Sequence, residues 1–276
     1  KKIEKWLSFY DIDRGFHKTV LVICAGNIPL VAFHDILCVL ILGNKLIIKP
    51  SSKDSILIHF VIKKLIEIQP KFSNLISFAK INNYCDVVIC TGNNVSATYF
   101  KYHFKETPSI IRSSRTSIAI LSGDEDEKEL RNLCDDIFTY FGLGCRNVTK
   151  IYIPKSYDFN ILKAYFQEYI SNLNCKSYLD NYIYNKALLS FKKKYFKDFG
   201  SILLVESKHT HPPISVLFFE YYNTLEEITF NSDSIQCIVS NVYRKSKTIP
   251  FGSAQKPELL DYADNLDTIS FLLKQS

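Results

Sequence analysis

One cysteine in this sequence has the surroundings of a nucleophile. Cys145 lies in the segment F-G-L-G-C-R-N (residues 141–147), between a stretch that predicts a helix and one that predicts a strand. The two glycines allow another backbone to approach closely, and the guanidinium of Arg146 favours a thiolate beside it. A thiolate in such a loop can form a thioester with an acyl group. The alternative is structural, because the same glycines can simply end the preceding helix.

A second candidate, Asn27, stands in a tight turn directly after residues 19–24, an apolar and β-branched run that predicts a buried strand. There its amide can donate a hydrogen bond to an oxyanion that develops during a reaction, together with a backbone N–H. Asn is also common in turns, where its side chain bonds to the nearby backbone. The residues alone leave both interpretations open.

Two further segments have the composition of a nucleotide site. Residues 49–53 (K-P-S-S-K) end one predicted strand and open a predicted helix, which brings ammonium groups and hydroxyls to a helix N-terminus, where phosphates bind. Residues 91–94 (T-G-N-N) follow another predicted strand in the same way. The chain contains neither G-x-G-x-x-G nor G-x-x-x-x-G-K-[ST], so these segments do not identify a nucleotide site by themselves.

Alternating strands and helices must position these residues. Strand, loop, helix and strand follow one another over residues 19–49, with a helix expected at 30–42, and the alternation is repeated in the second half of the chain. This order predicts an α/β fold with parallel sheets, in which the turns after the strands gather at one edge and bind ligands. We place domains at residues 1–122 (cofactor-binding) and 123–249 (catalytic), followed by a tail at 250–276.

Composition excludes several classes of protein. Of the 276 residues, 47% are hydrophobic and 22% are charged, which rules out a disordered chain. No apolar stretch is long enough for a transmembrane helix and no signal peptide heads the chain, so we expect a cytoplasmic protein. The net charge of +6 comes from scattered lysines, which argues against nucleic-acid binding. Eight cysteines without a C-x-x-C pair indicate free thiols in a reducing compartment and no metal site.

Taken in order, the candidate segments resemble those of a known family. The G-N-I-P-L, K-P-S, T-G-N and G-C motifs follow one another as in the aldehyde dehydrogenase superfamily. Four longer stretches are similar to its reductase branch, the LuxC-type acyl-CoA reductases of bacterial bioluminescence and their relatives. They are residues 25–35 (A-G-N-I-P-L-V-A-F-H-D), 140–147 (Y-F-G-L-G-C-R-N), 250–255 (P-F-G-S-A-Q) and 261–268 (D-Y-A-D-N-L-D-T). The resemblance runs from about residue 18 to residue 272.

The resemblance implies a fold of aldehyde dehydrogenase type, with two Rossmann-like α/β domains and the active site between them. It implies that Cys145 takes the acyl group from a thioester and that Asn27 supplies the oxyanion-hole amide. Lys49 corresponds to a lysine that reaches the adenosine ribose of the nicotinamide cofactor. Gly92 and Asn93 correspond to the glycine turn packed against its pyrophosphate.

Two departures from the superfamily pattern bear on the cofactor and on the reaction. Where NAD-preferring members carry a ribose-chelating Glu, this chain has Ser52, followed by Lys53. Repulsion of a 2′-phosphate is therefore absent, and NADPH is favoured. The region of the hydrolytic general base, residues 110–115, contains no carboxylate. A thioester reductase needs no hydrolytic water, because hydride attacks the acyl-cysteine carbonyl and releases an aldehyde.

We therefore expect NADPH to reduce acyl-CoA, or an acyl-carrier or acyl-protein thioester, to an aldehyde through an acyl group on Cys145. One alternative is a cysteine-dependent acyl transferase or thioesterase without a redox step. The nucleotide-binding segments argue against it. Another is a non-catalytic binding subunit on the same fold, which the presence of both Asn27 and Cys145 argues against.

The ends and the assembly of the chain give two further expectations. The sequence begins with Lys1, contains no Met and lacks the N-terminal part of the family. We therefore expect either a piece of a longer protein or Met residues that are not printed. The resemblance is also compatible with a homo-oligomer.

Overall fold

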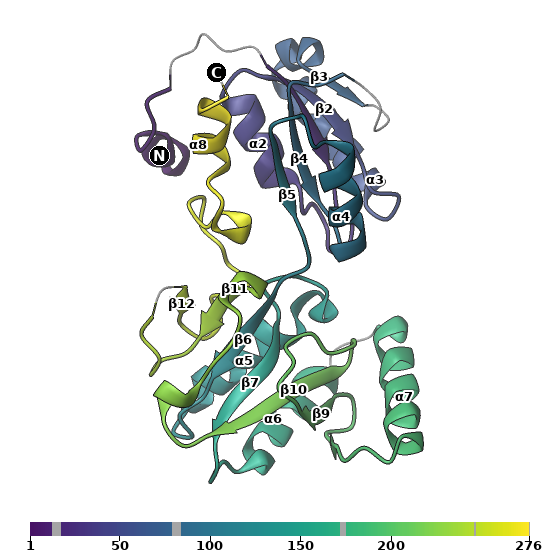
Figure 1. Cartoon of the computed structure of the whole chain (residues 1–276), viewed down its shortest axis with the longest axis vertical. Coiled ribbons are helices and arrows are strands. Elements are labelled where there is room, and N and C mark those ends of the chain that lie inside the picture. The colour runs from purple at the N-terminus through teal and green to yellow at the C-terminus, as the bar shows by residue number, and fades with distance from the viewer. Residues whose placement is uncertain (13–17, 79–83, 172–174, 246, 276) are drawn as a thin grey trace. The chain divides into compact units, whose positions relative to one another are not determined.

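By its internal contacts the chain divides into two compact units (Figure 1). The computed structural model describes residues 1–12, 18–78, 84–171, 175–245 and 247–275. Unit 1 comprises Lys1–Ser114 together with Glu258–Ser276, and unit 2 comprises Arg115–Pro257. Each unit is built on its own sheet of mainly parallel strands, which confirms the expected α/β fold.

Unit 1 contains a five-stranded parallel sheet with the order β3-β2-β1-β4-β5. The strands are β1 (Thr19–Ile23), β2 (Lys45–Lys49), β3 (Ile76–Phe78), β4 (Val87–Thr91) and β5 (Ser109–Arg112). The central strands β1, β2 and β4 are apolar and almost wholly buried, as strands covered on both faces must be. This is the strand order of a Rossmann-type sheet. From β1 the chain adds strands toward one edge of the sheet, and from β4 it adds them toward the other. Sheets of this type bind ligands where the order reverses, between β1 and β4.

Helices cover both faces of this sheet. They are α2 (Phe33–Ile41), α3 (Ser55–Ile68) and α4 (Asn94–His103), with the short α1 (Lys2–Leu7) and α8 (Thr268–Leu273) and the 3-10 helices η1 (Pro70–Asn74) and η5 (Ala263–Asn265). Apolar side chains of α2, α3 and α8 pack with one face of the strands, and those of α4 pack with the other. This division follows from right-handed crossovers, since the chain moves outward from the centre in opposite directions through α2 and α4.

The helix expected at residues 30–42 is shorter in the structure. It begins at Phe33, because Leu30 has a left-handed backbone (φ 55°) that a right-handed helix does not contain. The Leu30 N–H donates instead to the Asp54 carboxylate, at 2.7 Å. A side chain from the start of α3 therefore holds the β1–α2 loop out of helical form.

Unit 2 contains a seven-stranded sheet with the order β12-β11-β6-β7-β10-β9-β8. The strands are β6 (Thr116–Ile120), β7 (Val148–Pro154), β8 (Lys197–Asp198), β9 (Leu203–Glu206), β10 (Val216–Tyr222), β11 (Ile235–Val239) and β12 (Thr248–Ile249). All pairs are parallel except β8 with β9. The second half of the chain thus repeats the alternation of strand and helix, as expected.

The helices of unit 2 are α5 (Glu127–Phe138), α6 (Phe159–Ser171) and α7 (Lys176–Phe191), with the 3-10 helices η2 (Thr139–Gly142), η3 (Leu225–Glu227) and η4 (Ser232–Ser234). Apolar residues of α5 and α6 form a core with one face of the sheet. At the start of α5, Asp126 and Glu129 cap each other's backbone N–H groups. Across the described part of the chain, every helix is too short or too polar to span a membrane.

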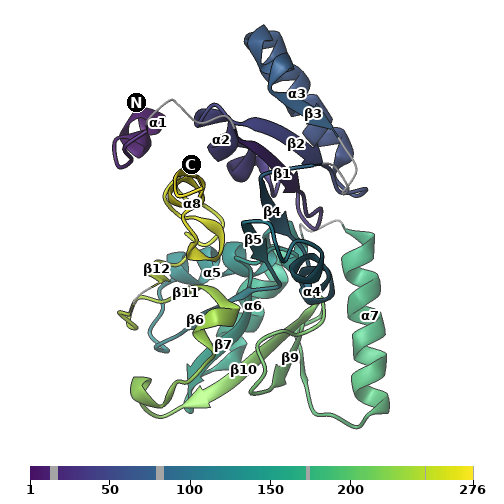
Figure 2. The same cartoon turned by 45° about the horizontal axis from the view of Figure 1, so that its top comes forward.

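The C-terminal segment Glu258–Ser276 returns to unit 1. Ile269 and Leu272 are buried in its core, and the indole N–H of Trp6 donates to the Tyr262 hydroxyl at 2.9 Å. Both views show α8 beside α2 (Figures 1 and 2). The units divide at 114/115 and 257/258, whereas the boundaries predicted from the sequence lie at 122/123 and 249/250. The difference arises because β6 pairs with β7 and β11, and because α8 packs on the first sheet.

Replacing Ile269 with Ala tests whether this segment belongs to the core of unit 1. Ile269 is fully buried, so the loss of its methyl groups and the cavity left behind should lower the free energy of unfolding by about 2–5 kcal/mol. Urea denaturation measures the change. The control is Lys274→Ala, on the same segment but exposed, which should stay within about 0.5 kcal/mol of the parent. A similarly small effect of Ile269→Ala would show that the core does not need the segment.

Candidate active site

Predicted site residues gather at the carboxyl edge of the sheet of unit 1. They are Asn27 after β1, Lys49 at the end of β2, Ser52 and Lys53 before α3, and Gly92 and Asn93 after β4. Ile23, the last residue of β1, is aligned with Lys49 on one side and with Cys90 on the other. The three strand ends are therefore neighbours. The seventh predicted residue, Cys145, lies in unit 2.

The loop after β1 is packed against the turn after β2. A Cβ on Gly26 would lie 2.7 Å from Ser51 Cβ and 3.1 Å from Lys53 Cβ, so a glycine is needed for the two segments to come this close. Asp54 is buried and accepts the hydrogen bond from the Leu30 N–H. The segments 25–30 and 49–54, which are separate candidates in the sequence, are thus one packed structure.

The turn after β4 is similarly close-packed. A Cβ on Gly92 would lie 2.8 Å from Ser96 Cβ, and the Gly92 N–H donates to the Arg112 carbonyl at 3.1 Å. The Asn93 side chain caps α4 by accepting a hydrogen bond from the Ser96 N–H at 2.8 Å. Asn93 is therefore the N-cap of α4, which begins directly after the turn that follows β4.

These residues fit a dinucleotide. Asn27, Ser52 and Lys53 are exposed and Lys49 is half-buried, while the N-termini of α3 and α4 open at the same edge. Ammonium groups, hydroxyls and backbone N–H groups at helix N-termini are the donors that phosphates and ribose require. Among the described residues, no three His, Cys, Asp or Glu side chains are grouped so as to hold a metal ion.

In unit 2, Cys145 is half-buried in the loop between η2 and β7. Before it, Tyr140, Phe141 and Gly142 are all left-handed, with φ of 54°, 57° and 74°. Two bulky residues in this conformation cost energy, and such strain persists only where the surroundings fix the backbone. The chain therefore turns sharply after α5 before it reaches the cysteine.

The Asn147 side chain is what fixes this loop. Its Oδ1 accepts from the Gly144 N–H at 2.8 Å, and its Nδ2 donates to the carbonyls of Thr139 and Ile137 at 2.8 and 3.0 Å. Asn147 is fully buried. One amide thus donates hydrogen bonds to the carbonyls at the end of α5 and accepts one from Gly144, and so joins the two ends of the loop that leads to Cys145. This role of Asn147 was not predicted from the sequence, in which the Gly-x-x-Asn spacing was the available signal.

A second anchor lies behind the loop. The Ser117 hydroxyl donates to the Cys145 carbonyl at 3.1 Å and lies 3.0 Å from the Cys237 thiol. Burial raises the pKa of Cys237 to about 11, although Ser117 and Arg146 act in the opposite direction. Cys237 therefore stays protonated at neutral pH and serves as a packing residue.

The other thiols differ in reactivity. Burial raises the pKa of Cys24, Cys90 and Cys134 to about 12, which makes them inert. Burial also raises the pKa of Cys38 and of Cys85. Cys175, at the start of α7, is the exception, because a hydrogen bond from Ser177 and nearby backbone N–H groups lower its pKa. It is a natural competitor against which any assignment of Cys145 must be checked.

The segment P-F-G-S-A-Q (residues 250–255) is fastened to α5 by Asp136. This buried carboxylate accepts from the N–H groups of Gly252 and Ala254, at 2.6 and 3.0 Å. Burial raises the pKa of Asp136 to about 6, and the two backbone bonds limit the rise. Gly252 has a φ of 80°, and a Cβ there would lie 2.8 Å from Asn132, so glycine is required at this turn.

Comparison with known proteins gives a family and a fold. A family model described as "Acyl-CoA reductase (LuxC)" matches residues 14–179. A search of the curated proteins found no match. The solved structures that are similar include the P. syringae AldA indole-3-acetaldehyde dehydrogenase in complex with NAD+ and IAA, at 13% identity and a TM-score of 0.62. The alignment covers 83% of this chain and 57% of that one.

Two further solved structures are alike to a similar degree. An NAD+ complex of an aldehyde dehydrogenase from Bacillus cereus is 13% identical with a TM-score of 0.63, over 80% of this chain and 55% of that one. A putative aldehyde dehydrogenase from Burkholderia cenocepacia is 12% identical with a TM-score of 0.64, over 84% and 59%. The expected aldehyde dehydrogenase-like fold is confirmed, and this chain spans little more than half the length of these structures.

A pH series on Asp136→Asn tests the burial of this carboxyl. Its folded pKa of about 6 lies above the ordinary value near 4, so folding favours the protonated form. Its contribution to stability is full below pH 4 and is lost as the pH rises through 6. The free energy of unfolding of the parent, relative to Asp136→Asn, should therefore fall between pH 4 and 7 by about 1.4 kcal/mol per unit of pKa shift. Chemical denaturation at each pH measures it.

Asp180→Asn is the control, because Asp180 is exposed on α7. Its curve should run parallel to that of the parent over the whole range. If Asp136→Asn also runs parallel, the carboxyl has an ordinary pKa and is not buried as described.

Proposed function

Because this chain belongs to the LuxC family of acyl-CoA reductases, we propose that it reduces an acyl thioester to an aldehyde, with NADPH as the reductant. The substrate is an acyl-CoA or an acyl-carrier or acyl-protein thioester, and Cys145 carries the acyl group. The observation that supports this most is the Cys145 loop, a half-buried thiol on a left-handed turn held by Asn147 and Ser117.

In the first half of the reaction the Cys145 thiolate attacks the carbonyl carbon of the thioester. A new C–S bond forms, and the π electrons of the carbonyl move to its oxygen. The amide of Asn27 donates a hydrogen bond to this oxyanion. When the oxyanion collapses, the bond to the departing sulfur breaks, and CoA or the carrier leaves as a thiolate and takes up the proton that Cys145 lost.

In the second half the acyl group leaves Cys145 as an aldehyde. When bound, the reduced nicotinamide supplies the hydride for the acyl carbon. Asn27 again donates to the oxyanion, whose collapse breaks the C–S bond and returns Cys145 as a thiolate. The balance is one thioester, one NADPH and one proton consumed for one aldehyde, one thiol and one NADP+. No hydrolytic water takes part, which agrees with the lack of a carboxylate at residues 110–115.

The edge of the sheet in unit 1 is the proposed cofactor site. Lys49 reaches the ribose, and the turn of Gly92 and Asn93 packs against the pyrophosphate. The NAD+ complexes among the similar structures support a nicotinamide nucleotide at this kind of fold. The preference for NADPH rests on Ser52 and Lys53, both exposed at this edge.

The carboxylate next along the chain does not oppose a 2′-phosphate. Asp54 is buried, and its Oδ2 accepts the Leu30 N–H, so it serves the loop and not the ribose. The eight cysteines, all of them among the described residues, form no disulfide, which suits a reducing compartment, and we place the reaction in the cytoplasm on that ground.

Mass spectrometry tests the nucleophile. After incubation with an acyl-CoA and no reductant, the protein should carry one acyl adduct, because hydride is needed to release it. Cys145→Ala should lose the adduct, and the matched control Cys175→Ala should keep it. An adduct that survives in Cys145→Ala, or that maps to Cys175, contradicts the assignment.

Adding NADPH to the acylated protein separates the proposal from its rivals. An aldehyde should appear as the adduct disappears. Free acid without aldehyde would indicate a thioesterase, and transfer of the acyl group to an added thiol would indicate a transferase. No adduct at all would indicate a binding subunit.

Ser52→Glu tests the cofactor preference. Exposed charge contacts are each worth about 0.2–1 kcal/mol, so the parent should favour NADPH over NADH by about tenfold in kcat/KM. The new carboxylate repels a 2′-phosphate and can chelate the ribose, and should move the ratio toward NADH. Ser52→Gln, of the same size without the charge, should change the ratio less. A parent that already prefers NADH, or a ratio that Ser52→Glu leaves unchanged, would rule out this ribose site.

A further inference from the structure

We propose that Arg112 and Thr268 are positioning residues for the loop of residues 25–32, which carries Asn27, and that they act through the Asp35 carboxylate. The inference rests on the proposed function in one respect, namely that Asn27 stabilises an oxyanion. Its structural part concerns only unit 1, where all of these residues lie.

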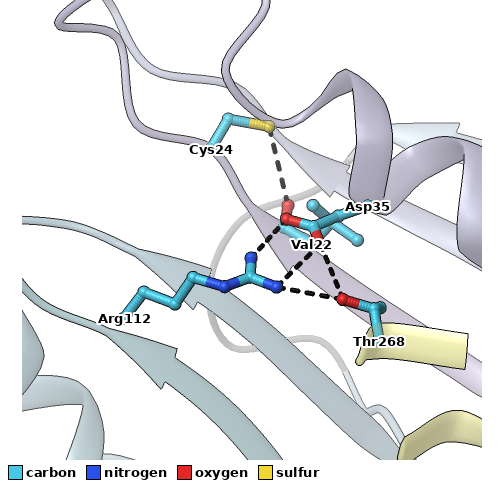
Figure 3. A network of polar contacts seen from close by, with 5 residues as sticks. All are labelled: Val22, Cys24, Asp35, Arg112 and Thr268. Carbon is cyan, nitrogen blue, oxygen red and sulfur yellow. Dashed lines mark hydrogen bonds and ion pairs between the residues drawn. The ribbon is translucent and has the colours of Figure 1, made fainter. Parts of the chain in front are cut away.

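The three side chains form a closed triangle of hydrogen bonds (Figure 3). The two terminal nitrogens of Arg112 donate to Oδ2 and Oδ1 of Asp35, at 2.6 and 3.0 Å. The Arg112 nitrogen that bonds Oδ1 also donates to the Thr268 hydroxyl at 3.0 Å, and that hydroxyl donates to Asp35 Oδ1 at 3.2 Å. The guanidinium fork fits the carboxylate in one orientation, so the triangle sets direction as well as distance.

Each corner of the triangle comes from a different part of the chain. Arg112 ends β5, Asp35 lies in the first turn of α2, and Thr268 opens α8, 233 residues away from Asp35. Two of the stretches on which the family resemblance rests, residues 25–35 and 261–268, therefore meet here.

The triangle is buried, which favours a role in positioning over one in stability. Arg112 is 2% exposed, Asp35 5% and Thr268 0%. Burying an ion pair costs about as much solvation as the attraction returns, so apolar residues of the same shape would serve stability equally well. What the apolar residues would not supply is a fixed direction for the Asp35 side chain.

Asp35 controls the far end of the loop. The near end is set by β1, and the middle by the bond from the Leu30 N–H to Asp54. From Leu30 the chain has only four residues before Asp35, and Leu30 is left-handed. The direction of the first turn of α2 therefore sets where the loop ends and, together with β1 and the Leu30–Asp54 bond, fixes the path of the loop that carries Asn27.

Contacts of two neighbouring residues also support this positioning role. His34, next to Asp35, contacts the Leu259 carbonyl of the C-terminal segment at 3.0 Å. Thr268 is itself held in place, because Asp267 caps α8 through the Ser270 N–H at 2.9 Å and accepts from the Tyr10 hydroxyl at 2.9 Å. The C-terminal segment thus offers Asp35 a rigid partner.

Hydrogen exchange on Thr268→Val tests the structural part without any activity. Val keeps the shape and removes the hydroxyl that completes the triangle. Amide exchange in residues 25–34 should become about tenfold faster, while β1 and β2 keep the rates of the parent, because only the support of the loop is lost. Thr268→Ser, which keeps the hydroxyl, should restore the parent pattern.

Kinetics test the functional part. Thr268→Val should lower kcat by about tenfold, since small displacements of a catalytic group cost this much or more, and should leave KM for acyl-CoA within about twofold. Asn27→Ala alone should lower turnover about 10²- to 10³-fold. In the Asn27→Ala background, adding Thr268→Val should change kcat less than twofold, because the group to be positioned is gone. Thr268→Ser should again behave as the parent.

The outcomes separate the two proposals. Unchanged exchange in the loop, or faster exchange throughout unit 1, overturns the positioning role whether or not the protein is active. Independent, multiplicative effects of Thr268→Val and Asn27→Ala overturn it as well. A parent protein that forms no acyl adduct and no aldehyde overturns the proposed function, and local loop exchange then still decides the role of Arg112 and Thr268.

Discussion

The ion pair between Arg112 and Asp35 is the buried interaction that joins three separate segments of unit 1, namely the end of β5, the first turn of α2 and, through Thr268, the start of α8. It ties the end of an edge strand to the helix that follows the central strand, with bonds of 2.6 and 3.0 Å. Burial lowers the pKa of Arg112, but the charge and hydrogen bonds of Asp35 outweigh this and hold the pKa above its ordinary value. Neither partner can leave the other without stranding a buried charge, so the segments that carry them cannot slide as purely apolar surfaces can.

The irregular loops at the candidate site share one solution to a common problem. A loop buried against a sheet has backbone N–H groups that neither helix nor strand satisfies, and each needs a partner. Asp54 accepts from Leu30, Asn147 accepts from Gly144, and Asp136 accepts from Gly252. Left-handed residues lie in each of these loops, where local conformational preference opposes the observed path. In each loop a single buried polar side chain therefore accepts the hydrogen bond from a backbone N–H group that a helix or a strand would pair with a backbone carbonyl.

How far the sequence could predict this structure depends on the range of the interaction concerned. Strands at residues 45–49 and 109–112 were predictable to the residue, because β-branched runs between polar residues are a local signal. The parallel order then brought the strand ends together, and Asn27, Lys49 and Gly92 with them. The start of α2 was not predictable, since it depends on a hydrogen bond from Leu30 to a residue 24 positions away.

The polar anchors were harder to find than the candidate reactive groups. Asn147 and Asp136 are fully buried, yet in a sequence a buried amide or carboxylate looks like one on the surface. The sequence of α8, six residues long, does not indicate which of the two sheets the helix covers. The boundary between the units near the C-terminus could therefore be obtained only from the structure. Asp35 and Thr268 lie in stretches that resemble the family, but their contact joins residues 233 positions apart, and no local pattern in the sequence predicts it.

The return of the C-terminal segment has a consequence for biosynthesis. Unit 2 is continuous in sequence, and its sheet can close as soon as its last strand leaves the ribosome. The sheet of unit 1 is complete at residue 112, but Thr268 is translated more than 150 residues later. At typical elongation rates of about 5–20 residues per second, the nascent first sheet waits roughly eight to thirty seconds with the Asp35–Arg112 pair uncovered on the side that α8 later occupies. During that interval the apolar surface that Ile269 later covers is exposed to water and to chaperones. A chain released early would therefore have an incomplete, aggregation-prone first unit and a complete second unit.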